Sequence, residues 1–216
     1  MCNAGVVQVP SNAGGAVTRT AGYIEQNARL VAPWLAEGLG PDFVVKPAGW
    51  DSLDAAVAAL APSASVQRRA VIPVGAWTLL LTNGPLGTDV GVLPSLATRQ
   101  WGCYGVRATC VEAAEHVFPG RVLEVYGPGG VPPLMALRSI TAMNDGGRWV
   151  FETSGEPFAF ERLGEYEHRL KRRRFTSALL YEYLRALGVP IDDEPAWTRA
   201  VVVEEDAVGG CTSTGR

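Results

Sequence analysis

The sequence predicts an α+β fold, in which an antiparallel β-meander of about five to six strands packs with N-terminal helices and a long C-terminal helix or helix pair. The middle of the chain alternates apolar and polar residues in short segments, separated by Gly, Pro, Asn and Asp. Both flanking regions instead repeat apolar residues at helical spacing. With 216 residues, 47% of them hydrophobic, the chain can bury a core without disulfides or metals.

The N-terminal region predicts two helices and one strand. Residues 1–20 are small and polar, and we interpret them as a flexible arm. Residues 21–38 carry large apolar side chains at helical spacing, and glycines at the end of the segment stop the helix. Residues 43–46 are typical of a short strand. Asp51 or Ser52 then caps a helix that continues to residue 60.

The central region predicts the meander. Residues 76–82 alternate between two faces, and a short helix is expected over 93–101. The segment Asn-Asp-Gly-Gly at 144–147 is a strong hairpin signal because these residues adopt positive φ at low cost. Strands joined by such short turns run antiparallel, since parallel strands need long crossovers. Four further strands are expected at 104–111, 121–126, 134–143 and 148–153.

The C-terminal region predicts a long helix followed by a tail. Residues 161–187 repeat apolar side chains at helical spacing, and Thr176 marks a break that would divide them into two helices. Residues 191–216 predict an acidic, partly disordered tail with one edge strand at 200–204. Residues 21–190 are therefore expected to form a single α+β domain.

Composition excludes several classes of function. The net charge of -3 gives no general attraction to nucleic acid or to anionic membranes, and no membrane contact is expected. No apolar run approaches the ~18 residues of a membrane helix, and the first residues lack the pattern of a secretory signal. The four cysteines form no CxxC pair. We expect a cytoplasmic protein with reduced thiols, and the preference for Arg over Lys indicates a GC-rich bacterial source.

No motif for a cofactor or a metal stands out. The glycine-rich segment 127–130 precedes Val131 and two prolines, which cannot begin the helix that a phosphate loop requires. We interpret this segment as a β-turn. Cys103, Cys110 and His116 are irregularly spaced and match no metal-ligand pattern. No cofactor and no metal are therefore expected.

An enzymatic alternative depends on a few weak candidates. Cys110 and His116 would form a nucleophile pair if the fold brings them within hydrogen-bond reach. Cys2 would become an N-terminal nucleophile after removal of Met1. Glu152 would supply acid–base chemistry if its environment shifts its pKa. These residues define a small hydrolase or transferase as the alternative to a binding protein.

A basic segment supplies the candidate binding residues, namely Arg169, Lys171, Arg172, Arg173 and Arg174. They belong to a stretch with seven basic and four acidic residues, whereas the last residues of the chain are mainly acidic. Such a stripe suits a protein partner and, as a less favoured alternative, the phosphates of nucleic acid bound by a regulator.

Trp197 completes the set of candidate binding residues. It lies in the expected tail, outside the expected core, where an indole could dock the tail or a partner. The leading hypothesis is a non-catalytic cytoplasmic protein-binding domain, such as a toxin-neutralising immunity protein or an adaptor.

Overall fold

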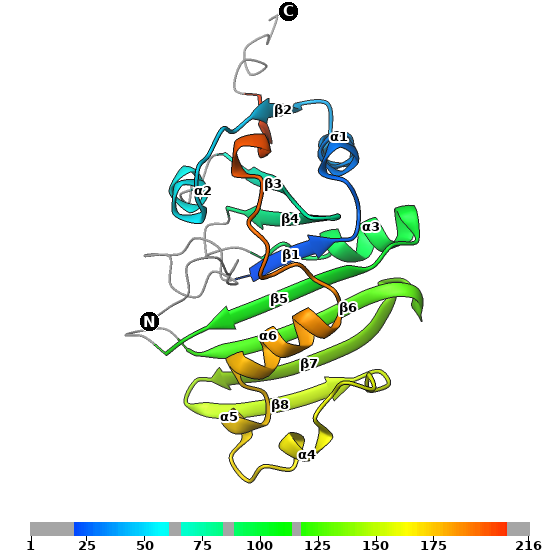
Figure 1. Cartoon of the computed structure of the whole chain (residues 1–216), viewed down its shortest axis with the longest axis vertical. Helices are drawn as coiled ribbons and strands as arrows, with labels where there is room; N and C mark the ends of the chain where they lie inside the picture. Colours follow the sequence, from blue (N-terminus) through cyan, green and yellow to red (C-terminus); the bar gives the residue numbers. More distant parts are fainter. Residues whose placement is uncertain (1–19, 61–65, 84–88, 114–117, 207–216) are drawn as a thin grey trace, which may run out of the picture.

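The computed structural model describes residues 20–60, 66–83, 89–113 and 118–206. They form one nine-stranded antiparallel sheet in the order β2-β9-β3-β4-β1-β5-β6-β7-β8 (Figure 1). The strands are β1 (Thr20–Ile24), β2 (Phe43–Pro47), β3 (Arg68–Val74), β4 (Trp77–Thr82), β5 (Gly105–Val111), β6 (Gly120–Val131), β7 (Ala136–Asp145), β8 (Arg148–Ser154) and β9 (Val201–Glu205). The predicted α+β class is confirmed, but the expected five to six strands are too few.

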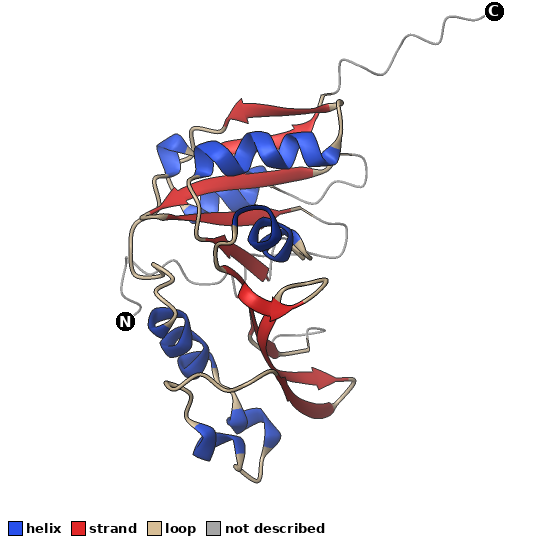
Figure 2. Cartoon of the chain, turned by 90° about the vertical axis from the view of Figure 1, so that its right-hand side faces the viewer, coloured by secondary structure: helices blue, strands red, loops and turns tan. Residues whose placement is uncertain are grey.

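Helices cover the sheet on both faces, so two hydrophobic cores are present (Figure 2). On one face α1 and α3 pack over the strands that include Ile24, Val71 and Leu80. On the other face α2, α4 and α6 pack over the larger core, which includes Tyr23, Leu79 and the fully buried aromatic rings of α6 and its flanks. The helices are α1 (Ala28–Leu39), α2 (Leu53–Ala59), α3 (Leu93–Trp101), α4 (Leu163–Tyr166), α5 (Lys171–Arg174), α6 (Ser177–Ala186) and the 3-10 helix η1 (Trp197–Arg199). None of these helices combines the length and apolar character that crossing a bilayer requires.

The expected meander is present as β5 to β8. Each of these strands pairs with the next in antiparallel register. The β7–β8 turn consists of Gly146 and Gly147, both with positive φ, as the hairpin signal predicted. The short helix α3 and the cap of α2, in which the Ser52 side chain accepts from the Ala55 N–H at 3.2 Å, also match the prediction.

The N-terminal segment differs from the prediction, because its first residues form a strand and not a helix. β1 lies in the middle of the sheet between β4 and β5, and every residue of it is buried. The helix begins only at Ala28, after the Asn27 side chain caps it by accepting from the Arg29 N–H at 2.9 Å. Apolar residues that recur at helical spacing also suit a short strand buried on both faces, which explains the error. The arm expected at residues 1–20 lies outside the described residues except for Thr20.

The C-terminal segment also differs, since residues 191–206 belong to the fold. β9 lies inside the sheet, where it pairs with both β2 and β3. Glu204 of β9 forms ion pairs with Lys46 of β2 at 3.1 Å and Arg68 of β3 at 3.0 Å. The predicted edge strand at 200–204 is thus an interior strand, and the predicted tail is structured up to Asp206. Two neighbouring strands explain this outcome, because they satisfy both sides of its backbone.

The expected long helix is three short helices. α6 begins at Ser177, where the Thr176 side chain accepts from the Leu179 N–H at 3.3 Å, so the expected break at Thr176 is confirmed. Upstream, a buried ion pair fixes a non-helical loop against the sheet: Arg138 of β7 donates to both carboxylate oxygens of Glu161, at 2.9 and 2.7 Å. The Glu161 side chain is fully buried and also accepts from the Tyr166 hydroxyl and the Phe158 N–H, both at 2.9 Å. These contacts outweigh the helical preference of the surrounding sequence.

Candidate functional site

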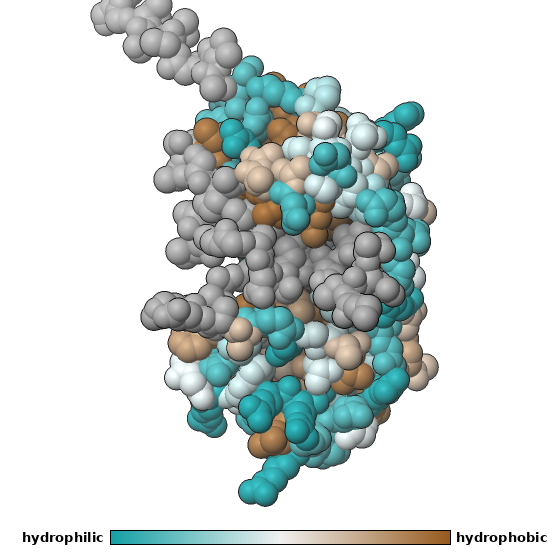
Figure 3. Space-filling view, turned by 60° about the vertical axis from the view of Figure 1, so that its left-hand side comes forward, coloured by the Kyte–Doolittle hydropathy of each residue, from teal (hydrophilic) through white to brown (hydrophobic). Residues whose placement is uncertain are grey.

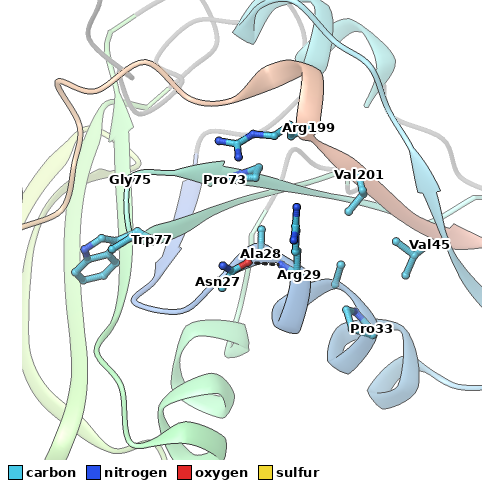
Figure 4. A pocket seen from close by; sticks show the side chains of 12 residues that line it. Asn27, Ala28, Arg29, Pro33, Val45, Pro73, Gly75, Trp77, Arg199 and Val201 are labelled. Carbon is cyan, nitrogen blue, oxygen red and sulfur yellow. Dashed lines mark hydrogen bonds between the residues drawn. The ribbon is translucent and has the colours of Figure 1, made fainter.

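A cavity of about 480 Å³ opens between the N-terminal half of α1, the β3–β4 turn and η1 (Figure 4). Apolar side chains of β2, β3, β4, β9 and α1 form its walls, and a cavity of this size suits a small molecule or a few residues of a peptide. The residues that line it are Asn27, Ala28, Arg29, Ala32, Pro33, Val45, Pro73, Gly75, Ala76, Trp77, Arg199 and Val201.

Local hydrogen bonds hold the elements of this cavity in place. The Asn27 cap fixes the first turn of α1, and the Thr78 hydroxyl of β4 donates to the Gln26 carbonyl at 2.6 Å. On the opposite wall, the Ala196 N–H just before η1 donates to the Pro73 carbonyl of β3 at 2.8 Å. Gly75 adopts a φ of +54°, which makes the tight two-residue turn between β3 and β4 favourable. Rigid elements therefore form the walls, which is typical of a preformed site.

Two arginines line this cavity from different elements. Figure 4 shows the Arg29 side chain rising from α1 into the cavity and the Arg199 side chain, from η1, lying beside Pro73 on the opposite wall. Both are exposed, and neither forms an ion pair or a side-chain hydrogen bond with any residue that the structure describes. One acidic side chain, Asp193, approaches the Gly75 turn, with its Oδ2 3.3 Å from the position that a Cβ at Gly75 would occupy. Two guanidiniums against one carboxylate leave the mouth of the cavity positively charged.

This arrangement is suited to an anionic group on an apolar ligand. Guanidinium is a planar donor that stays charged at all physiological pH values and matches carboxylate and phosphate oxygens in pairs. Trp77, Val45 and Val201 offer apolar surface for the remainder of the ligand. The chemistry available is therefore binding and orientation of an acid.

The predicted nucleophile Cys110 lies in a different place. Its side chain is buried beneath α6, where the thiol contacts the Ser177 hydroxyl at 3.5 Å and the Glu112 carboxylate at 3.7 Å. Ser177 donates to Glu112 at 2.6 Å, and Arg121 donates to both of them, at 3.0 Å to Ser177 and 2.7 Å to Glu112. The four side chains thus form one hydrogen-bonded cluster that joins β5, β6 and α6.

The electrostatics of this cluster keep the thiol protonated. Burial raises the pKa of the Cys110 thiol above its ordinary value, and the Glu112 carboxylate raises it further, against the opposing effect of the hydrogen bond with Ser177. The separate hydrogen bond that Ser177 donates to Glu112 lowers the pKa of the Glu112 carboxyl, together with the charge of Arg121. Because the thiolate is the nucleophile, these shifts oppose a catalytic role for Cys110.

The other enzymatic candidates do not join Cys110. Glu152 lies on β8, exposed, opposite Thr141 of β7. Cys2 and His116 lie outside the described residues. Cys103 and Cys110 are free thiols that pack in the separate cores on opposite faces of the sheet. Within the described ranges, no group of three or more His, Cys, Asp or Glu residues could hold a metal ion.

The predicted basic segment is brought together on one short helix. Lys171, Arg172, Arg173 and Arg174 form α5, and Arg169 precedes it. Arg174 is held in place, since it donates to the His168 carbonyl at 2.8 Å and its guanidinium lies 5.6 Å from the centre of the Phe151 ring. The end of the molecule that carries α4 and α5 is largely hydrophilic in Figure 3.

The expectation that Trp197 lies outside the core is wrong. Its indole is buried in the larger core, and its N–H donates to the Glu194 carboxylate at 2.7 Å. Trp197 therefore attaches the C-terminal segment to the domain and is not exposed for a partner.

Arg29 and Arg199 were not among the residues singled out in the sequence. They lie near opposite ends of the chain, and neither is part of a charge run or a motif. The Asn27 cap signals a helix start, but only the placement of η1 beside β3 puts both arginines on the same cavity. No protein family matches this chain, and no curated protein or solved structure is similar to it.

Proposed function

We propose that this chain is a non-catalytic protein-binding domain of the cytoplasm, of the immunity or adaptor kind, that captures an acidic side chain of its partner in the Arg29–Arg199 cavity. The carrying observation is that two arginines line one cavity, Arg29 and Arg199, and that neither has a carboxylate partner among the described residues. Arginine is a common anchor for carboxylates at protein interfaces.

A binding role is favoured over catalysis because the cavity contains donors but no group suited to proton transfer or nucleophilic attack. Its polar side chains are two arginines, one asparagine and the indole of Trp77. The thiol that sequence reasoning proposed as a nucleophile is buried elsewhere, and its pKa is raised. Orientation of an anionic group is the chemistry that remains.

The direct test uses the full chain labelled with ¹⁵N and the peptide acetyl-Glu-Phe-Glu-amide. We expect the Nε–Hε signals of Arg29 and Arg199 to shift on titration, and the Gln-Phe-Gln counterpart to leave them unchanged. Replacing both arginines by alanine should abolish binding. Asp193→Asn should strengthen it, because one opposing charge is removed. Arg99→Ala, an exposed arginine on α3, is the matched control.

The biological test is capture of a stoichiometric protein partner from the source cells. The double variant Arg29→Glu/Arg199→Glu should lose that partner, and the Arg99→Glu control should retain it. Equal capture by both variants, or binding of the glutamine peptide as tightly as the glutamate peptide, would show that the cavity is not the recognition site.

A further inference from the structure

The two edges of the sheet are protected differently. β2 ends one edge with Lys46 and Pro47, and a charged side chain and a proline are both features that discourage further strand pairing. β8 ends the other edge with the sequence Arg-Trp-Val-Phe-Glu-Thr-Ser, which contains no proline. It pairs with β7 in regular register along all seven residues, without a bulge. Within the described part of the chain, β8 has no second strand beside it.

The hairpin register shows which backbone groups of β8 face outward. Asp145 and Arg148 flank a two-residue turn and therefore form a hydrogen-bonded pair. Hydrogen-bonded and non-bonded pairs alternate along an antiparallel ladder. Consequently Trp149, Phe151 and Thr153 direct their N–H and C=O groups away from β7, toward the open edge.

Unpaired cations lie on and just before α5, the helix that packs against β8. α5 packs against β7 and β8, and Arg174 contacts the Phe151 ring. The side chains of Arg169, Arg172 and Arg173 are exposed and form no ion pair or hydrogen bond with any described residue. Figure 2 shows the short helices at the lower end of the molecule displaced from the lowest strands, on one side of the sheet.

We propose that the β8 edge binds an extended acidic segment of a partner protein, which adds a strand to the sheet. Its backbone would pair with the outward groups of Trp149, Phe151 and Thr153, the mode known as β-augmentation. Because side chains alternate along a strand, every second residue of the segment would face α5. Acidic residues at those positions complement the cations of Arg169, Arg172 and Arg173.

Charge decides between this occupant and the two other candidates. A second copy of the chain paired through β8 would bring two α5 helices to the same face, and their like charges would repel. A nucleic acid would use the cations but would leave the outward N–H and C=O ladder of β8 without matching groups. An acidic peptide satisfies both the backbone and the charges.

The test measures binding of the fluorescein-labelled peptide (Glu-Val)₅ to the full chain by fluorescence anisotropy. Thr153→Pro removes an outward N–H while leaving the β7 pairing intact, so we expect affinity to fall by about tenfold or more. Thr153→Val keeps that N–H and is the matched control, with affinity within about twofold of wild type. Arg172→Glu/Arg173→Glu should weaken binding, and added salt should do the same.

A second measurement alters the peptide and leaves β8 and α5 unchanged. It uses the Arg29→Glu/Arg199→Glu variant, in which the cavity no longer attracts acidic side chains. A (Glu-Val)₅ peptide with N-methyl groups on alternate residues keeps its charge but loses the N–H donors along one side of its backbone, and it should not bind this variant. The same variant should retain binding of the unmodified peptide at β8, because β8 and the cavity lie at opposite ends of the sheet. Loss in that variant would assign the peptide to the cavity.

Three results would overturn the proposal. One is equal affinity for the N-methylated and unmodified peptides. Another is competition by a single-stranded oligonucleotide that binds α5 more tightly than the peptide does. The third is a dimer of the chain in sedimentation that Thr153→Pro dissociates, since a second copy would then occupy the edge.

Discussion

Glu161→Ala removes the carboxylate that holds Arg138 inside the protein. The Arg138 side chain is 3% exposed and the Glu161 side chain 0%, so neither group can recover its hydration when its partner is lost. The carboxylate accepts four hydrogen bonds: two from Arg138, one from the Tyr166 hydroxyl and one from the Phe158 N–H. In the Glu161→Ala variant, all four donors would lose the carboxylate as their acceptor.

The size of the stability loss depends on the Arg138 charge, which would stay buried without a partner. Removing one partner of a buried ion pair costs about 3–5 kcal/mol, because an uncompensated charge is left in the interior. We expect Glu161→Ala to lower the free energy of unfolding by that amount. The double variant Arg138→Met/Glu161→Leu should recover most of it, since a buried ion pair and apolar residues of similar volume are often equivalent in stability. Recovery should be incomplete, because Arg138 also donates to the carbonyls of Ser154 and Gly155.

Urea denaturation followed by circular dichroism measures these differences at pH 7. The single variants Arg138→Met and Glu161→Leu, together with the double variant, form a cycle that isolates the coupling between the two side chains. If Glu161→Ala lowers the free energy of unfolding by less than about 1 kcal/mol, the reasoning is refuted, because an exposed ion pair contributes that much. So would a double variant whose loss equals the sum of the two single losses.

Two further predictions concern the cluster beneath α6. Because Ser177 lowers the pKa of the Glu112 carboxyl, that contribution to stability is present above the ordinary pKa of 4.5 and is lost as pH falls through the lower folded value. The stability difference between wild type and Ser177→Ala should therefore be largest at neutral pH and shrink on acidification in urea titrations; a pH-independent difference would contradict this assignment. Burial and a raised pKa should make Cys110 react with iodoacetamide at pH 7 far more slowly than a free cysteine, as followed by mass spectrometry of the tryptic peptide. Rapid labelling of Cys110 in the folded protein would revive the enzymatic alternative.

The parts of the fold that follow local rules were predicted from sequence. The β7–β8 turn depends on two consecutive glycines with positive φ, which only a few residue types adopt without cost. The cap at Ser52 and the helix break at Thr176 depend on side chains that accept from backbone N–H groups three residues later. Such contacts join residues three or four positions apart, so the sequence alone contains both partners.

Tertiary structure decided the features that join distant segments. β1 and β9 are interior strands because strands from elsewhere in the chain lie on both sides of them, and the pattern of each strand contains no information about those neighbours. The Arg138–Glu161 pair is buried only because the loop before α4 returns to β7. The glycine turn, the Ser52 cap and the alternation of the meander could be predicted because their energies are local. Arg29 and Arg199 line one cavity, and β8 lies at an edge of the sheet, only because distant segments of the chain pack together. Local energies do not specify such long-range contacts.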